Sequence, residues 1–369
     1  MNGDIVKTGL TTGACAQAAA KACALMLATG DIVDNIDIEL PNGETHAVPL
    51  INQKLSENCA RCGVIKDSGE ERNDVTNGIE IFCEIKEKQD PGINIIGGKG
   101  VGKVTRHGLA VKIGESAINP TPRKMIMRDL CDILPPDKGY MIEISVPKGE
   151  EVAQATYNPR LGVVGGISII GTTGIVKPKS QESYKKSLMV ELDVAQAAGY
   201  KTLFIASGYL GERLLTGKYN IEPQRIIKVG DHVGFMLKAC LEKKISKIMV
   251  IGHIGKLAKV AAGLFNTHSE TGDARMETIA AYAAAKGAAK ELIAELLGLK
   301  LAEASIDLLR KNNLMKVFDD IAERVAQRCA QYCGDKLAVA VAILSLKGEI
   351  IGRYPKDIFE GEIWEKFIS

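Results

Sequence analysis

Hydrophobic and polar positions divide the chain into two stretches with different patterns. Up to about residue 155, short runs such as Ile36–Leu40 alternate between apolar and polar residues, and Asn42-Gly43 separates this run from the next. Alternation is typical of strands with one buried face, and Asn-Gly between two such runs indicates a hairpin. A helix is expected from Asn119 to about Leu134. Segregated strands and helices predict an N-terminal α+β domain over residues 1–155.

From residue 156 onward, short continuous apolar runs are each followed by a helical pattern. These runs are Ile167–Ile170, Thr202–Ala206, Ile226–Val229 and Lys247–Ile251. Continuous apolar runs suit parallel strands buried on both faces, and repeated strand–helix units imply a parallel sheet between layers of helices. We therefore predict a C-terminal α/β, Rossmann-like domain over residues 156–369.

Glycine-rich turns follow several of these runs. Gly171-Thr-Thr-Gly174 comes directly after the first run, where its glycines let a ligand approach the backbone and its hydroxyls can bond to that ligand. Ligands of open parallel sheets bind at the carboxyl ends of the strands. The candidate binding residues are Gly171, Thr172, Thr173, Gly174, Gly230, Asp231 and Gly252. An ordinary strand-to-helix turn is the alternative interpretation.

Two histidines belong to the same part of the pattern. His253 follows the run Lys247–Ile251, and His268 lies in a predicted loop beside Asn266 and Thr267. Histidine transfers protons near neutral pH, binds metals and donates hydrogen bonds. We predict a functional role for His253 and, less directly, for His268; the alternative is a surface histidine without function.

A basic, glycine-rich segment precedes the expected helix at Asn119. Gly97-Gly-Lys-Gly-Val-Gly-Lys103 has the spacing of a phosphate loop, but Val104 stands where a magnesium-binding Ser or Thr is needed. A nucleoside triphosphatase is therefore disfavoured. Lys99, Lys103 and the following Arg106 remain candidates for binding a carboxylate, and a solvated basic turn is the alternative. The start of the first helix, near Thr12, is a second candidate anion site, and a tightly packed structural helix with a good cap is the alternative.

Composition narrows the class of protein. The 369 residues are 46% hydrophobic and 25% charged, with a net charge of +2, nine cysteines and one tryptophan. This composition is ordinary for a globular enzyme and gives no support for a nucleic-acid partner. No signal peptide or membrane-spanning run is recognised, so we predict a cytoplasmic protein with reduced thiols. The pair Cys59 and Cys62 lacks further ligands at zinc spacing, and we interpret both as structural thiols. No oligomeric state is indicated.

Six segments in order along nearly the whole chain resemble the cobalt-precorrin-5B C(1)-methyltransferase family of anaerobic cobalamin biosynthesis. They are Thr8–Cys15, Val64–Asp67 with Asp74–Thr76, Gly98–Gly102, Asn119–Arg123, Gly166–Gly174 and Gly252–Ser269. The loop Glu70–Asp74 departs from the aspartate-rich pattern usual in that family.

The resemblance implies transfer of a methyl group from S-adenosylmethionine to carbon C1 of cobalt-precorrin-5B, giving cobalt-precorrin-6A. It implies that the N-terminal domain binds the carboxylates of the tetrapyrrole and that the C-terminal domain binds the methyl donor at the glycine-rich turns. The expected carboxylate ligands are Thr12, Lys99, Lys103, Arg106 and Arg123. His253, and after it His268, is the candidate general base. No protein-bound metal is expected, because cobalt arrives inside the substrate.

Two other functions remain open. A nicotinamide-dependent tetrapyrrole reductase would need a fuller glycine fingerprint and an acidic residue after the second strand, where this chain has Ile205-Ala-Ser-Gly208. A non-catalytic corrinoid carrier would bind the macrocycle without affinity for the methyl donor.

Overall fold

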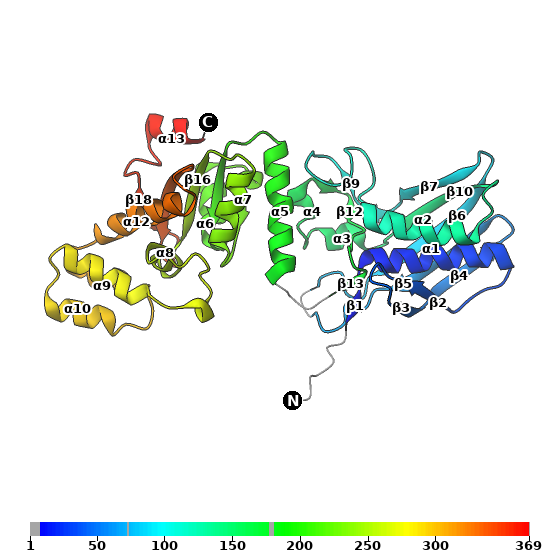
Figure 1. The fold of residues 1–369 in the computed structure, drawn as a ribbon, viewed down its shortest axis with the longest axis horizontal. Helices are drawn as coiled ribbons and strands as arrows, with labels where there is room; N and C mark the ends of the chain where they lie inside the picture. Colours follow the sequence, from blue (N-terminus) through cyan, green and yellow to red (C-terminus); the bar gives the residue numbers. More distant parts are fainter. Residues whose placement is uncertain (1–7, 72–73, 177–180, 369) are drawn as a thin grey trace. The chain divides into compact units, whose positions relative to one another are not determined.

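A computed structural model describes residues 8–71, 74–176 and 181–368. The structure is a mixed α/β fold with several multi-stranded sheets, and it divides into two compact units between Ser183 and Tyr184 (Figure 1).

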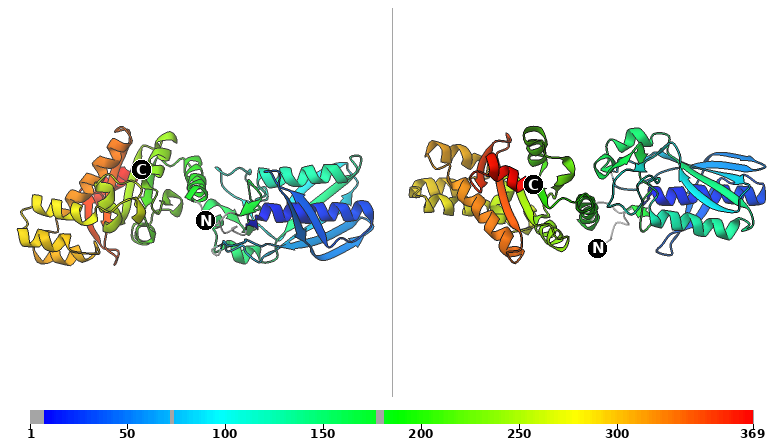
Figure 2. Two further views of the ribbon diagram at one scale, coloured as in Figure 1. Left: turned by 60° about the horizontal axis from the view of Figure 1, so that its bottom comes forward. Right: turned by 90° about the horizontal axis from the view of Figure 1, so that it is seen from above.

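Unit 1 is built on a five-stranded sheet with two long helices along one face. Its strand order is β4 (Ile51–Ser56), β5 (Cys59–Ile65), β6 (Glu80–Lys88), β10 (Gly139–Ser145) and β7 (Gly92–Gly97). Only the β10–β7 pair is parallel in this sheet. The helices α1 (Thr12–Thr29) and α2 (Pro120–Ile133) lie side by side (Figures 1 and 2), and α1 packs on β5 and β6.

Small side chains allow α1 to be buried on nearly all sides. Thr11 caps its start by accepting the Ala14 N–H, and Gly30 ends it in the left-handed conformation. The hairpin expected around Asn42-Gly43 is confirmed, because β2 (Asn35–Glu39) pairs antiparallel with β3 (Thr45–Pro49). The other elements of unit 1 are β1 (Gly9–Leu10), β8 (Gly100–Val101), β9 (Lys103–Val104), α3 (Gly149–Ala153), α4 (Asn158–Leu161), β11 (Val163–Val164), β12 (Gly166–Ile167) and β13 (Ile175–Val176).

The prediction that Ile167–Ile170 is the first strand of the C-terminal sheet is wrong. β12 pairs parallel with β8, and β13 pairs antiparallel with β1, so this stretch belongs to unit 1. The Ile169 carbonyl accepts the Asn119 N–H, and the Ile169 N–H donates to Ala117 O. These partners satisfy the backbone of the short apolar run within unit 1. The helical pattern predicted to follow this run starts after Pro178, and residues 177–180 lie outside the described ranges.

Unit 2 is built on a five-stranded sheet covered on both faces. Its strand order is β15 (Ile226–Lys228), β14 (Thr202–Ala206), β16 (Lys247–His253), β17 (Ala338–Leu344) and β18 (Ile350–Tyr354), and only β18 is antiparallel. The helices are α5 (Gln181–Ala197), α6 (Tyr209–Tyr219), α7 (Val233–Glu242), α8 (Ile254–Ala261), α9 (Arg275–Ala285), α10 (Lys290–Leu297), α11 (Ala304–Lys311), α12 (Val317–Tyr332) and α13 (Gly361–Ile368), with single turns η1 (Pro223–Arg225) and η2 (Ser269–Thr271).

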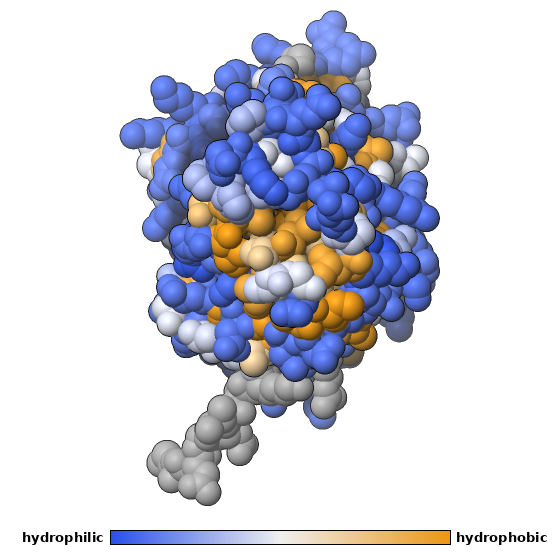
Figure 3. All heavy atoms as spheres, turned by 90° about the vertical axis from the view of Figure 1, so that its right-hand side faces the viewer, coloured by the Kyte–Doolittle hydropathy of each residue, from blue (hydrophilic) through white to orange (hydrophobic). Residues whose placement is uncertain are grey.

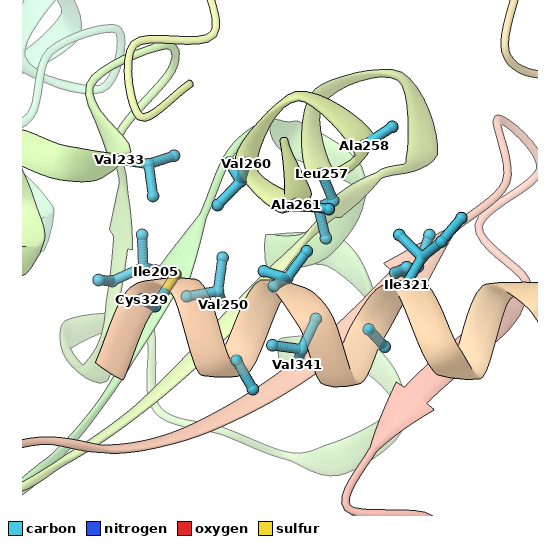
Figure 4. Close-up of a cluster of buried hydrophobic side chains, with 14 of the residues drawn as sticks. Ile205, Val233, Val250, Leu257, Ala258, Val260, Ala261, Ile321, Cys329 and Val341 are labelled. Carbon is cyan, nitrogen blue, oxygen red and sulfur yellow. The ribbon is translucent and has the colours of Figure 1, made fainter. Parts of the chain in front are cut away.

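The larger core of unit 2 lies on one face of this sheet. Strand residues Ile205, Val250 and Val341 face Ile321 and Cys329 of α12, with side chains of α7 and α8 beside them (Figure 4). Phe204, Met249 and the neighbouring alternate residues form a separate cluster with α6 and the C-terminal segment on the other face. Burial on both faces explains why these strands are continuous apolar runs.

The order of strands fixes where a ligand of this sheet is expected. The chain runs from β14 outward to β15 on one side and then crosses back to β16 on the other side of β14. The direction of winding therefore reverses between β14 and β16. The carboxyl ends of the strands at such a reversal form the ligand crevice of open parallel sheets.

The distribution of apolar side chains on the surface does not by itself locate a binding site. Figure 3 shows an apolar patch surrounded by polar side chains at one end of unit 1. Apolar atoms form a large part of every folded protein's surface, so this patch alone does not identify a binding face. None of the described helices has the length and apolarity needed to cross a membrane.

Candidate active site

Three loops meet at the carboxyl edge of the unit 2 sheet. They are Ser207-Gly208 after β14, Val229–His232 after β15, and the end of β16 at Gly252-His253. They lie together because β14, β15 and β16 are parallel neighbours in register. The predicted residues Gly230, Asp231 and Gly252 are therefore on one edge.

Asp231 is an ionised carboxylate with one oxygen already held. Its Oδ1 accepts a hydrogen bond from Thr267 Oγ1 at 2.8 Å and lies 3.1 Å from Lys256 Nζ. Burial acts to raise the pKa of Asp231, but the bonds from Thr267 and Lys256 prevail and lower it. The other oxygen, Oδ2, has no partner among the described residues. The carboxylate is thus oriented and can still accept hydrogen bonds from a ligand.

Lys256, which sequence reasoning missed, fixes the geometry of this edge. Its Nζ donates to Ser207 O at 2.9 Å and to Gly230 O at 3.2 Å, in addition to its ion pair with Asp231. The ammonium therefore joins the ends of β14 and β15. A lysine one turn into the helix after a strand was the available signal.

Gly252 is required by close packing against Ser207. A Cβ at position 252 would lie 1.8 Å from Ser207 Oγ. The Ser207 side chain is only 1% exposed, and its hydroxyl has no hydrogen-bond partner among the described residues.

His253 has a structural role in this geometry. Its Nδ1 accepts the Gly255 N–H at 3.0 Å, which caps α8, and its Nε2 lies 2.9 Å from Glu303 Oε2. Because Nδ1 accepts, the proton is on Nε2 and is donated to Glu303. The ring has no free lone pair, so the geometry does not support the predicted role of His253 as a base.

His268 is placed near Asp231 but is bonded in a similar way. Its Nδ1 accepts the Glu270 N–H at 3.3 Å, and its side chain is 43% exposed. The neutral ring therefore carries its proton on Nε2. His268 can donate a hydrogen bond to a ligand, but its one acceptor nitrogen is already occupied.

His232 was missed by sequence reasoning, although it directly follows Asp231 at the end of a strand. Its ring lies 5.6 Å from that of Tyr184, and it makes no capping bond to the start of α7. Burial lowers the pKa of His232 and nearby Lys185 lowers it further, while Asp231 opposes both. His232 is therefore predominantly neutral at pH 7.

The turn Gly171–Gly174 does not follow a strand of the unit 2 sheet, contrary to the prediction that groups it with Asp231. It lies in unit 1 against the start of α1, where a Cβ on Gly171 would be 2.2 Å from Thr11 Oγ1. Gly174 O accepts the Thr11 N–H. Thr172 is exposed, and Thr173 Oγ1 bonds to the backbone of Ile175. The turn lies in unit 1 because the strand before it, β12, pairs with β8 of the same unit.

The start of α1 is closed to an anion by the protein itself. Thr12 is 4% exposed, and its hydroxyl exchanges hydrogen bonds with the backbone of Ser168 and Ile170. The Gly13 N–H donates to Ile170 O at 2.9 Å. The geometry therefore does not support Thr12 as a carboxylate ligand.

The predicted basic residues of unit 1 differ in accessibility. Lys99 and Lys103 are exposed and flank β8. Arg106 donates from one terminal nitrogen to Arg160 O, and Arg123 donates to Ile95 O. Lys99, Lys103 and Arg106 share one segment, whereas Arg123 belongs to α2.

A buried ion pair explains part of the loop Glu70–Asp74. Lys66 is 2% exposed, and its Nζ lies 2.6 Å from Asp74 Oδ2 and 2.5 Å from Ser68 Oγ. Ser68 Oγ also donates to Asp74. Asp74 thus neutralises a buried cation and fixes one end of the loop. Arg72 and Asn73 lie outside the described residues.

Cys59 and Cys62, the pair predicted to be structural thiols, differ in burial. Cys62 is buried, with its sulfur 3.5 Å from that of Cys23, and Cys59 is half-buried. No cluster of three or more His, Cys, Asp or Glu side chains suited to a metal ion occurs within residues 8–71, 74–176 and 181–368.

Comparison with known proteins gives consistent matches. The profile of the CbiD family matches residues 1–178, and that of the CbiD C-terminal domain matches residues 266–355. The chain is 44% identical to the cobalt-precorrin-5B C(1)-methyltransferase of Moorella thermoacetica over 94% of this chain and 95% of that protein. It is 41% identical to the protein of the same name from Methanocaldococcus jannaschii, over 98% and 97% of the two chains.

One solved structure is also similar. It is the crystal structure of a cobalamin biosynthesis protein (cbiD) from Archaeoglobus fulgidus, which is 30% identical. The match covers 72% of this chain and 83% of that chain, with a TM-score of 0.39.

Proposed function

The chain belongs to the CbiD family, and from this membership we propose that it methylates carbon C1 of cobalt-precorrin-5B, giving cobalt-precorrin-6A, with S-adenosylmethionine as the donor. The support is the name shared by relatives that are 44% and 41% identical over nearly the whole chain. The nine free cysteines suit a reducing, cytoplasmic setting.

The position of Asp231 is the main structural support for the proposed donor site. β14 and β15 are the first two strands of the sheet, so Asp231 follows the second strand, where Rossmann-type sheets place an acidic residue that bonds to a ribose hydroxyl. Its Oδ1 is held by Thr267 and Lys256, and Oδ2 is open among the described residues. An oriented carboxylate of this kind suits the ribose diol of S-adenosylmethionine.

Methyl transfer requires the donor and the macrocycle to be held in contact more than it requires covalent catalysis by the protein. The sulfonium of the donor activates the methyl group, and an electron-rich ring carbon attacks it in line. Holding two reactants in such contact can lower the barrier by roughly 7–11 kcal/mol. Cobalt is part of the substrate in this reaction.

Unit 1 is the proposed binding unit for the carboxylates of the tetrapyrrole. Lys99 and Lys103 are exposed on one segment, followed by Arg106. Charge-assisted bonds from such cations suit carboxylates. We favour Lys99 and Lys103 over Thr12, Arg106 and Arg123, whose polar groups bond to backbone carbonyls within unit 1.

The nicotinamide-dependent reductase stays the alternative enzyme. One argument against a reductase was that no acidic residue follows the second predicted strand. That argument no longer holds, because β15 is the second strand of the unit 2 sheet and Asp231 follows it. The turn after the first strand, Ser207-Gly-Tyr-Leu-Gly211, still departs from the dinucleotide glycine fingerprint. A corrinoid carrier would leave the donor site unused.

Mass spectrometry of the tetrapyrrole tests the proposal. We expect a gain of one methyl group after anaerobic incubation of the full chain with cobalt-precorrin-5B and S-adenosylmethionine. Calorimetry separates the alternatives, since binding of NADPH without binding of S-adenosylhomocysteine indicates the reductase. No methylation, together with no S-adenosylhomocysteine binding, would leave the carrier.

A further inference from the structure

The three histidines near the carboxyl edge of the unit 2 sheet differ in which ring nitrogen keeps a free lone pair. In His253 and His268, Nδ1 accepts a backbone N–H, and Nε2 therefore carries the proton. In neither ring is Nδ1 a free acceptor. His232 makes no bond from either ring nitrogen to a described residue, so one nitrogen of its neutral ring is a free acceptor.

The surroundings of His232 favour its neutral form. Tyr184 and Lys185 face it from α5, Asp231 precedes it, and His268 approaches from the loop after α8. Burial and the positive charge of Lys185 lower the pKa of His232 below the ordinary 6.5, and the opposing effect of Asp231 is smaller. The ring is half-buried, so part of it remains reachable from solvent.

We propose that His232 accepts the proton released by the macrocycle during methyl transfer, an inference that rests on the proposed function. The donor site is assigned to Asp231, and His232 is the next residue of the same loop, so the proposal places the transferred methyl group on the imidazole side of that loop. The reacting ring carbon must reach that methyl group, which brings the acidic positions of the macrocycle close to the same imidazole.

An electron pair of the macrocycle forms the new carbon–carbon bond at C1, and the sulfur–methyl bond breaks with its electrons returning to sulfur. The donor thereby loses its positive charge and the macrocycle gains one. Loss of a proton from the methylated macrocycle to the free nitrogen of His232 removes the charge that the macrocycle gained and leaves an imidazolium, which releases the proton to water.

His232→Ala tests this role under single-turnover conditions with saturating S-adenosylmethionine and cobalt-precorrin-5B. Because a positioned general base contributes roughly 10²- to 10⁴-fold, we expect the methylation rate to fall by that factor. Added imidazole should restore part of the lost rate. The affinity for S-adenosylhomocysteine, measured by calorimetry, should stay within about twofold of the wild type, since no donor contact is removed.

The pH profile gives a second readout. The wild-type rate should fall as the pH drops through a value below 6.5, because protonated His232 cannot act as a base. This acid limb should be absent from His232→Ala and present in His46→Ala, the matched control, whose histidine lies on the hairpin strand β3 of unit 1.

Several results would overturn the inference. A wild-type rate in His232→Ala, or in His232→Gln if the alanine variant does not fold, shows that no proton passes to His232. A slower rate that imidazole does not restore, with an equal loss of S-adenosylhomocysteine affinity, assigns His232 to binding instead. If the wild-type chain itself does not methylate the tetrapyrrole, the proposed function fails first.

Discussion

Asp231→Asn removes the negative charge at the proposed ribose site while keeping the shape of the side chain. The asparagine oxygen can still accept the bond that Thr267 donates at 2.8 Å. The ion pair with Lys256 is lost, but both side chains are about one-third exposed, at 35% and 30%, and such pairs contribute only about 0–1 kcal/mol. We therefore expect little change in the free energy of unfolding.

Donor affinity should respond much more strongly. A hydrogen bond to a charged group contributes roughly 1.5–3 kcal/mol, and every 1.4 kcal/mol is a factor of ten in affinity. Asp231→Asn should thus weaken binding of S-adenosylhomocysteine by about 10- to 150-fold. Because the pKa of Asp231 is lowered, affinity that depends on its charge should be constant from about pH 5 to about pH 8.

Isothermal titration calorimetry of the full chain measures this change. Asp307→Asn is the matched control, because Asp307 is also in unit 2 but its side chain is 78% exposed and pairs with Arg310. The control should bind like the wild type. Wild-type affinity in Asp231→Asn would refute the donor site, and an equal loss in both variants would show that the effect is not specific to it.

Three further predictions concern the rest of the chain. Asp74→Asn removes the negative charge that neutralises the buried cation of Lys66 and should lower the unfolding free energy of unit 1 by roughly 3–5 kcal/mol in urea denaturation; a loss below about 1 kcal/mol would contradict this. Burial acts to raise the pKa of Asp74, but the hydrogen bonds that its carboxylate accepts lower this pKa to about 2. The stabilisation by Asp74 is therefore present above about pH 4 and is lost as the pH falls toward 2, a loss that the variant should not show. Gly252→Ala should lower the free energy of unfolding by about 1–3 kcal/mol, because its Cβ would lie 1.8 Å from Ser207 Oγ. The loss should be smaller in a Ser207→Ala background, and equal losses in both backgrounds would argue against the contact. Iodoacetamide should label exposed Cys131 before the other eight thiols, and mass spectrometry showing a buried thiol labelled first would contradict the burial.

Local patterns determined the elements whose pairing partners are close in sequence or whose faces are uniformly buried. The helix expected from Asn119 to about Leu134 is Pro120–Ile133, and the hairpin around Asn42-Gly43 is present. The apolar run Thr202–Ala206 is a strand with the same bounds. Caps, turn residues and the period of apolar residues depend on a few neighbouring positions, so the sequence displays them directly.

Tertiary contacts determine which sheet each run joins and which polar groups are already bonded. Ile167–Ile170 has the composition of a buried parallel strand, yet its backbone finds partners in unit 1, and this moves Asp231 to the end of the second strand of the unit 2 sheet. His253 and His232 look alike in sequence, since each ends a strand pattern. The fold gives one of them a backbone N–H and Glu303 as partners and leaves the other with a free lone pair. Hydrogen-bond partners come from residues distant along the chain, so the chemistry of a side chain is set by packing that no local pattern encodes.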